Sequence, residues 1–184
     1  MAKQRVTKED WIEIGFNALI ESGYSALRAE SLCKSAGTTK GSFYWHFEDL
    51  PDYKSTLLDH WKSNVIQHLD ELKQEDNAAP RKLEKLAKSM CAIEEPMQEA
   101  RAERAIRAWA LEEPIAEAAI AETDSARKTY ASVLLSSIGL SNPEITEAMY
   151  ATFVGLNESR GQSDVDQASI ISTLLAAFIA LAES

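Results

Sequence analysis

Apolar residues recur along most of the chain at the three- and four-residue spacing of an amphipathic helix. In the first such stretch, Thr7 is placed as an N-cap and Asp10 follows three residues later, which is the spacing of a capping box. The positions that share one face after this cap are Ile12, Gly15, Phe16, Leu19, Ile20 and Gly23. Because glycine commonly ends a helix, we expect this one to stop at Gly23.

Glycine and proline divide the rest of the chain into further helical segments. Two short helices are predicted over residues 29–36, with Leu32 and Cys33 facing inward, and over residues 39–47. The longer predicted helices cover residues 51–72, 81–94, 98–111, 114–138, 142–160 and 163–183. No stretch shows the sustained alternation of apolar and polar residues that is typical of a β-strand. The fold is therefore predicted to be all-α, with about nine helices.

Composition supports a folded protein with a core of its own. The chain has 184 residues, of which 45% are hydrophobic and 26% are charged, so a disordered chain is not expected. The two cysteines, Cys33 and Cys91, cannot form a CxxC motif and are expected to be small buried side chains. The N-terminal residues lack a signal-peptide pattern, and residues 168–182 are too short an apolar stretch to span a bilayer. We expect a soluble, cytoplasmic protein without a membrane partner.

Charge at first argues against nucleic acid as a partner, because the formal net charge is −10. The acidity is unevenly distributed. Residues 1–50 carry six basic and seven acidic side chains, whereas residues 51–184 carry thirteen and twenty-two. The segment 38–47 contains no acidic residue and offers hydroxyls, a lysine, a histidine and several aromatic rings. Such a surface can approach DNA phosphates without repulsion between like charges.

The residues around this segment resemble a known signature. It reads Ala36-Gly37-x-x-Lys40-Gly41-Ser42-Phe43-Tyr44-x-His46-Phe47, preceded by Gly23-Tyr24, and it resembles the TetR/AcrR (tetracycline-repressor-like) family of transcriptional regulators. The resemblance covers roughly residues 6–58. It implies a three-helix helix-turn-helix DNA-binding domain over residues 1–50 and a larger helical domain for ligand binding and dimerisation over residues 51–184.

The resemblance also implies roles for individual residues. Those expected to face base edges or nearby phosphates at the start of the recognition helix are Thr38, Thr39, Lys40, Gly41 and Ser42. Those expected to contact the DNA backbone, a sugar or a thymine methyl group are Thr7, Arg28, Tyr44, Trp45 and His46.

The sequence departs from the family pattern after the His-Phe pair. Family members usually carry a lysine near the start of the next helix, whereas this chain has the run Glu48-Asp49-Leu50-Pro51-Asp52, and its first lysine is Lys54. Thr38 also replaces a more usual apolar residue. Lys54 is kept as a candidate DNA contact. With fewer phosphate contacts, we expect weaker DNA binding and a shallower dependence on salt.

Large side chains in the second domain are candidates for lining an effector pocket: Trp61, Met90, Met97, Trp109, Tyr130, Tyr150 and Phe153. The alternative is that they simply form the core between helices. The last helix is apolar almost all round, which predicts burial on several sides. Together with residues 142–160, two copies would form a four-helix interface about a twofold axis.

These features favour a dimeric, ligand-responsive repressor that binds a pseudo-palindromic operator. The alternative is a helical dimeric adaptor or small-molecule-binding protein that does not bind DNA. An enzyme is not expected, because the sequence contains no HExxH, GxSxG, P-loop or GxGxxG motif. His60 and His68 lie eight residues apart without further ligands at suitable spacing, so neither a metal nor a cofactor is expected.

Overall fold

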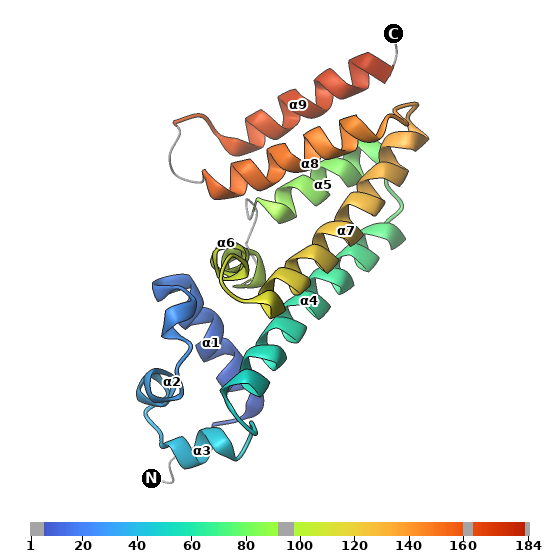
Figure 1. The fold of residues 1–184 in the computed structure, drawn as a ribbon. Coiled ribbons are helices and arrows are strands. Elements are labelled where there is room, and N and C mark those ends of the chain that lie inside the picture. The colour runs from blue at the N-terminus through green and yellow to red at the C-terminus, as the bar shows by residue number, and fades with distance from the viewer. Residues whose placement is uncertain (1–5, 92–97, 160–163, 183–184) are drawn as a thin grey trace. The chain divides into compact units, whose positions relative to one another are not determined.

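The computed structural model describes residues 6–91, 98–159 and 164–182, and these residues form helices and connections without any strand (Figure 1). The all-α prediction is confirmed. The elements are α1 (Lys8–Ser22), η1 (Tyr24–Ala26), α2 (Ala29–Ser35), α3 (Lys40–Tyr44), α4 (Leu50–Gln74), α5 (Ala79–Met90), α6 (Gln98–Ala110), α7 (Pro114–Ser137), α8 (Pro143–Glu158) and α9 (Gln167–Ala182).

Most predicted helix ends lie within a few residues of the observed ones, because glycine, proline and capping side chains determine them. Gly23 ends α1 with φ of 73°, a value that L-residues rarely adopt. Asn142 caps α8 through a hydrogen bond from the Glu144 amide, as the Asn-Pro pair indicates. The predictions differ for α3, which is shorter than residues 39–47, and for α9, which begins at Gln167 rather than at residue 163. The 3₁₀ turn η1 was not predicted.

The chain forms two compact units. Unit 1 contains Met1–Asn64 and Arg101–Ala121, and unit 2 contains Val65–Ala100 and Glu122–Ser184. Helices α4, α6 and α7 therefore contribute residues to both units. The expected division into domains at residue 50 stays a prediction.

Unit 1 is organised around the buried face of α1. The predicted capping box is present: the Thr7 hydroxyl accepts from the Asp10 amide, and the Asp10 carboxylate accepts from the Thr7 amide. Of the predicted face, Ile12, Gly15, Phe16 and Leu19 are buried, as is Trp11. In α2 the inward residues are Leu32 and Cys33, as expected.

A group of aromatic rings connects α1, α3 and α4. The Phe43 ring lies 5.3 Å from the Trp11 ring in an edge-to-face arrangement and 5.2 Å from the ring of Tyr53. Phe47 contacts Tyr53 at 4.8 Å. Such ring pairs add to the free energy gained from burial. They fix α3, the predicted recognition helix, against the first turns of α4.

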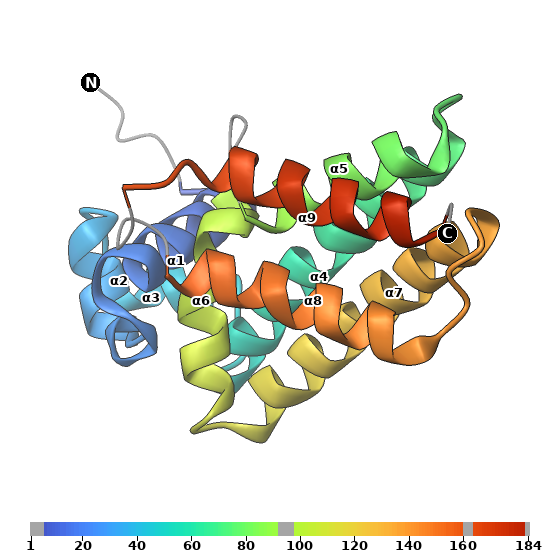
Figure 2. The ribbon, with the colours of Figure 1, turned by 90° about the horizontal axis from the view of Figure 1, so that it is seen from above.

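Unit 2 has an apolar core to which α4, α5, α7, α8 and α9 contribute. Its fully buried members are Ala87, Cys91, Ala131, Leu135, Met149, Phe153 and Ile171. Helix α5 packs against both α8 and α9, and α8 and α9 run in opposite directions (Figure 2). None of the helices in the described ranges has both the length and the apolar character needed to cross a membrane.

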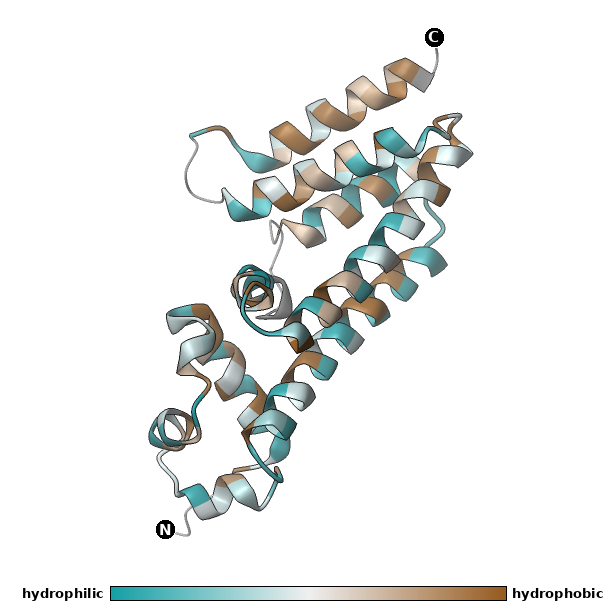
Figure 3. Ribbon diagram, in the orientation of Figure 1, coloured by the Kyte–Doolittle hydropathy of each residue, from teal (hydrophilic) through white to brown (hydrophobic). Residues whose placement is uncertain are grey.

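Helix α9 carries apolar or small residues around most of its surface (Figure 3). Ile171 and Leu175 are buried in the core of unit 2. The exposed positions of this helix are Ser169, Ser172, Thr173, Ala176, Ala177, Ala180 and Leu181. Most of these side chains are small, and none is charged. This surface is called the α9 face below.

Candidate nucleic-acid interface

The connection between α2 and α3 is a tight turn at Gly37. This glycine has φ of 59°, in the left-handed region where a side chain would be strained. The turn is closed by backbone hydrogen bonds from Gly37 to Lys34 and from Thr38 to Cys33. Thr39 then caps α3, with its hydroxyl accepting from the Ser42 amide at 3.4 Å. The sequence therefore sets where the short helix begins and in which direction it runs.

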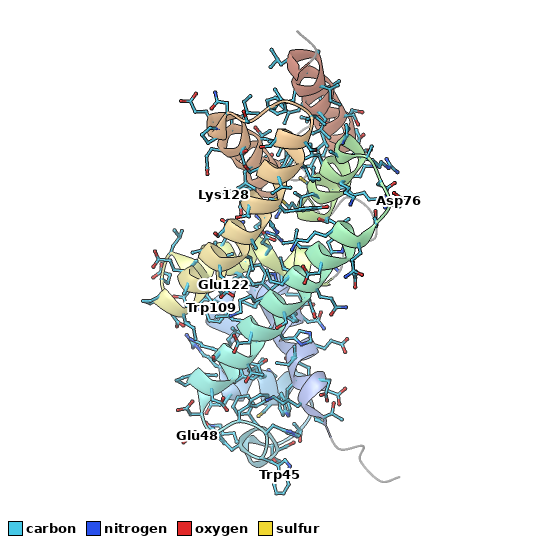
Figure 4. The ribbon with its side chains drawn as sticks, turned by 90° about the vertical axis from the view of Figure 1, so that its right-hand side faces the viewer. Trp45, Glu48, Asp76, Trp109, Glu122 and Lys128 are labelled. Atoms are coloured by element: carbon cyan, nitrogen blue, oxygen red, sulfur yellow. The ribbon has the colours of Figure 1, made fainter. Side chains whose placement is uncertain are left out.

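The segment 38–47, which contains α3, has aromatic side chains in the core and others in solvent. Phe43 and Phe47 are buried, whereas the side chains of Tyr44 and Trp45 are 50% and 70% exposed. Figure 4 shows the Trp45 side chain pointing away from the ribbon. The other tryptophans, Trp11, Trp61 and Trp109, are all 0% exposed. An exposed tryptophan beside an exposed tyrosine is costly in water, and such a pair is typical of a binding surface.

Lys40 at the start of α3 is paired with an acidic residue of α2. Its ammonium nitrogen lies 2.5 Å from Glu30 Oε1, and both side chains are exposed. The hydrogen bond between them raises the pKa of Lys40 and lowers the pKa of Glu30. Sequence reasoning missed Glu30, because ten residues separate the two in the chain. The one lysine of the recognition segment therefore has an acidic partner on the same surface.

Two further residues predicted to contact DNA also serve the fold. His46 Nε2 lies 2.9 Å from the backbone oxygen of Val6 and so connects the end of α3 to the residues before α1. The Thr7 hydroxyl is used in the capping box. Arg28 occupies the N-cap position of α2 and is exposed. Whether these residues touch DNA stays a prediction.

The acidic run after Phe47 has a local structural role. The Asp49 carboxylate accepts from the Asp52 amide at 2.8 Å, and the Asp52 carboxylate accepts from the Glu48 amide at 2.9 Å. These bonds satisfy amides at the start of α4, and negative charge is favourable at a helix N-terminus. The acidic residues that are expected to weaken phosphate binding are therefore the ones that begin α4. An Asp two residues before a proline is the sequence signal that could have identified this cap.

Lys54, the remaining candidate DNA contact, lies partly buried in unit 1. Its side chain is 16% exposed, and its ammonium nitrogen lies 2.5 Å from Glu113 Oε1. Burial by itself would raise the pKa of Glu113, but hydrogen bonding to Lys54 and Trp109, together with the charge of Lys54, outweighs burial and lowers that pKa. The structure does not bring Lys54 onto the exposed surface that carries Tyr44 and Trp45.

The candidate effector-pocket residues fall into separate groups. Trp61 and Trp109 belong to unit 1, and Met97 lies outside the described residues. The members in unit 2 are Met90, Tyr130, Tyr150 and Phe153, all buried in its apolar core. Their role as a pocket therefore stays a prediction.

Two hydroxyl groups in that core differ in their surroundings. The Tyr150 hydroxyl donates to Asp124 at 2.8 Å. The Tyr130 hydroxyl is buried without a hydrogen-bond partner. No group of three or more potential metal ligands occurs within the described ranges.

The sequence of the helix-turn-helix matches a known family. The family model for bacterial regulatory proteins of the tetR family matches residues 12–49. The HTH-type transcriptional regulator YwcC of Bacillus subtilis is 34% identical over 76 residues, which are 40% of this chain and 34% of YwcC. The transcriptional regulator AcuR of Cereibacter sphaeroides is 30% identical over 69 residues, or 38% of this chain and 32% of AcuR. The chain thus spans about a third of the length of these curated relatives.

Solved structures match the fold over nearly the whole chain. A transcriptional regulator from Rhodococcus sp. Rha1 has a TM-score of 0.77 at 20% identity, covering 95% of each chain. A regulator from Saccharomonospora viridis in complex with choline has a TM-score of 0.75 at 14% identity, covering 94% of this chain and 95% of that one. FadR from Bacillus subtilis in complex with stearoyl-CoA has a TM-score of 0.67 at 14% identity, covering 94% and 98%.

The matched residues, 12–49, include α2, the Gly37 turn and α3. The family is one of regulatory proteins rather than of enzymes. The local geometry and the sequence match agree: residues 12–49 form a helix-turn-helix that matches the tetR family of bacterial regulatory proteins.

Proposed function

We propose that the protein is a homodimeric, ligand-responsive transcriptional repressor that binds a pseudo-palindromic operator through α3. The observation that carries this proposal is the exposure of Tyr44 and Trp45, at the end of α3, in a segment (residues 38–47) that has no acidic residue. In a dimer, each α3 would enter one major groove, with half-site centres about 34–36 Å apart or a multiple of that spacing.

The side chains of this surface are suited to contact base edges in the major groove as well as phosphates. Lys40 supplies a positive charge, and the hydroxyls of Thr38 and Ser42 can donate to phosphate oxygens or base edges. The Tyr44 hydroxyl suits the DNA backbone, and the Trp45 ring suits a sugar or a thymine methyl group. The roles of Thr7, Arg28, Thr39 and His46 are proposed on the same basis.

Gly41 is the position where a close approach of DNA to the protein backbone can be tested. A Cβ placed at Gly41 would have only the Thr39 hydroxyl nearby, at an ordinary distance of 3.7 Å. The fold itself therefore does not require glycine here. We propose that the backbone at Gly41 lies against the DNA, where a methyl group would separate the two surfaces.

The DNA-binding claim is tested with fluorescence-labelled DNA from upstream of the protein's own gene. The double variant Lys40→Ala/Tyr44→Ala is expected to lose specific binding, because it removes a charge and a backbone contact together. Lys73→Ala is the matched control, because it removes an exposed lysine of unit 2. Unchanged binding by the double variant would show that α3 is not the recognition helix.

The homodimer is proposed to form through the α9 face and the adjoining surface of α8. The exposed residues of α8 include Ala148, Ala151 and Gly155, and a Cβ at Gly155 would meet nothing within 4 Å. Small side chains on both helices permit close helix packing, and an uncharged exposed face of this extent is typical of a surface that is covered by a partner.

Sedimentation velocity tests the dimer. Wild type is expected to sediment as a dimer, and Ala177→Glu as a monomer, because the substitution would bury an unpaired charge between the two copies. Thr129→Glu, at an exposed position of α7, is the control and should leave the dimer intact. A dimer that binds no DNA would favour the helical adaptor instead.

A small-molecule effector is proposed to bind in the regulatory domain. The support is the pair of solved relatives with choline and with stearoyl-CoA, together with the buried Tyr130 hydroxyl that lacks a hydrogen-bond partner. A ligand that favours one conformation would change the distance between the two α3 helices of the dimer. That distance would no longer match the half-site spacing, and the operator would be released. Screening by thermal shift, followed by release of labelled DNA, tests this proposal.

A further inference from the structure

Lys54 is turned toward the interior of unit 1. Its side chain is 16% exposed, compared with 54% for Lys40. The ammonium nitrogen lies 2.5 Å from Glu113 Oε1, and the two residues are 59 positions apart in the chain. A phosphate would have to compete with the Glu113 carboxylate for this lysine. Lys54 is therefore part of the packing of unit 1.

Glu113 is held in place by the backbone at the junction of α6 and α7. Its amide donates to the carbonyl of Trp109 at 3.1 Å. Its own carbonyl accepts from the amides of Ala116 and Glu117 in the first turn of α7. Because both helix ends fix Glu113, its ion pair with Lys54 connects the second turn of α4 to a rigid corner.

The same ammonium group also lies over an aromatic ring. Lys54 Nζ is 5.6 Å from the centroid of the Trp109 ring, and Trp109 is fully buried. The Trp109 ring stacks on Tyr24 of η1, with centroids 6.4 Å apart and planes 3° apart. Lys54 of α4 thus contacts Trp109 of α6. Trp109 in turn contacts η1, the segment that leads into α2. A cation over a buried indole ring adds to the attraction of the ion pair.

The preceding residue attaches α4 to α1. The Tyr53 hydroxyl is buried and donates to the Trp11 carbonyl at 2.8 Å. Consecutive residues therefore hold the start of α4 from two directions, Tyr53 toward α1 and Lys54 toward the α6–α7 junction. Since α3 packs on the same turns of α4 through Phe43 and Tyr53, the position of α3 depends on both attachments.

We propose that Lys54 is a positioning residue, which sets DNA affinity by holding α4 against Glu113 and Trp109 without contacting a phosphate. The inference rests on the proposed DNA-binding function. Losing one partner of a partly buried ion pair leaves the other charge uncompensated, so both partners matter to the packing. An ion pair between two exposed side chains would contribute little to the stability of the packing.

The test compares Lys54→Met, Glu113→Gln and the exchanged pair Lys54→Glu/Glu113→Lys, measuring operator affinity over a range of NaCl concentrations. Both single variants are expected to weaken binding by roughly three- to thirtyfold, the range for residues that act at a distance from a ligand. The slope of log affinity against log salt should stay unchanged. The exchanged pair should recover part of the loss, and Lys54→Arg should bind like wild type.

A different pattern would overturn the proposal. If Lys54 touches a phosphate, Lys54→Met makes the slope shallower by about 0.9, and Glu113→Gln leaves affinity unchanged or raises it. Urea unfolding of each variant identifies any that fail to fold; if Lys54→Met fails to fold, Glu113→Gln still separates the two roles. Wild type that binds no operator would contradict the proposed function, whereas wild type that binds with Glu113→Gln unaffected would contradict only the role of Lys54.

Discussion

The hydroxyl group of Tyr53 occupies the space that a side chain at Gly15 would need. A Cβ at Gly15 would collide with the Tyr53 hydroxyl oxygen and would lie 3.1 and 3.2 Å from the two methyl carbons of Leu57. Burial raises the pKa of this hydroxyl far above its ordinary value of 10.0, so it stays protonated and can donate to Trp11. Gly15 thus allows α1 and α4 to approach closely enough for that bond.

Gly15→Ala is therefore expected to destabilise the protein, by about 1–3 kcal/mol, as overpacking in a core does. Tyr53→Phe removes the colliding oxygen, so the double variant should be more stable than the sum of the single effects predicts. Urea unfolding of the four proteins measures this coupling. Strictly additive effects would mean that Gly15 and Tyr53 do not share the space.

Glu30→Gln is expected to increase operator affinity. Glu30 holds Lys40 and adds a negative charge to the surface that meets DNA, so removing its charge frees Lys40 for a phosphate. Glu21→Gln, which removes another exposed charge, from the last turn of α1, controls for net charge. Fluorescence anisotropy at fixed salt gives the comparison, and an equal gain from both variants would indicate a general charge effect.

Gly41→Ala is expected to leave the fold intact while lowering DNA affinity. Alanine is favoured over glycine in a helix by up to about 1 kcal/mol, and the added Cβ has room in the free protein. Thermal unfolding and DNA binding should therefore change in opposite directions. If Gly41→Ala binds as tightly as wild type, the backbone of α3 does not lie against the DNA.

The contribution of Glu113 to stability should depend on pH. Because its pKa in the folded protein is below its ordinary value of 4.5, its ionised form stabilises the fold above that pH. This contribution is lost as the pH falls through the lower, folded-state pKa. The difference in unfolding free energy between wild type and Glu113→Gln should be constant near neutral pH and shrink below about pH 4.5. A difference that persists in acid would point to packing rather than charge.

The helices and the family could be predicted from sequence because their signals are local. Gly23, Gly37 and the Asn142-Pro143 pair determine helix ends within a few residues of themselves. The inward positions of α1 follow from spacing alone. The α3 prediction extended too far for the same reason. Trp45 and His46 continue the local sequence pattern, but the regular helix ends at Tyr44.

The pairing of charges could not be predicted, because it depends on which helices lie together. Lys54 and Lys40 were both expected to meet phosphate, yet each has a carboxylate partner from another helix or helix junction. The acidic residues Asp49 and Asp52 were interpreted only as a loss of DNA affinity, whereas they also cap α4. The sequence shows which kind of group a charged residue can bind, whereas the fold determines which partner lies within reach.

The uneven burial of the four tryptophans gives the protein a spectroscopic label of its own. With Trp11, Trp61 and Trp109 sealed from solvent and Trp45 70% exposed, iodide in solution can collide with one indole group and not with the others. Quenching of tryptophan fluorescence by iodide therefore reports on Trp45, the residue directly after α3. Shielding of that emission by operator DNA, and its return when an effector releases the DNA, would allow occupancy to be followed in real time without attaching a dye.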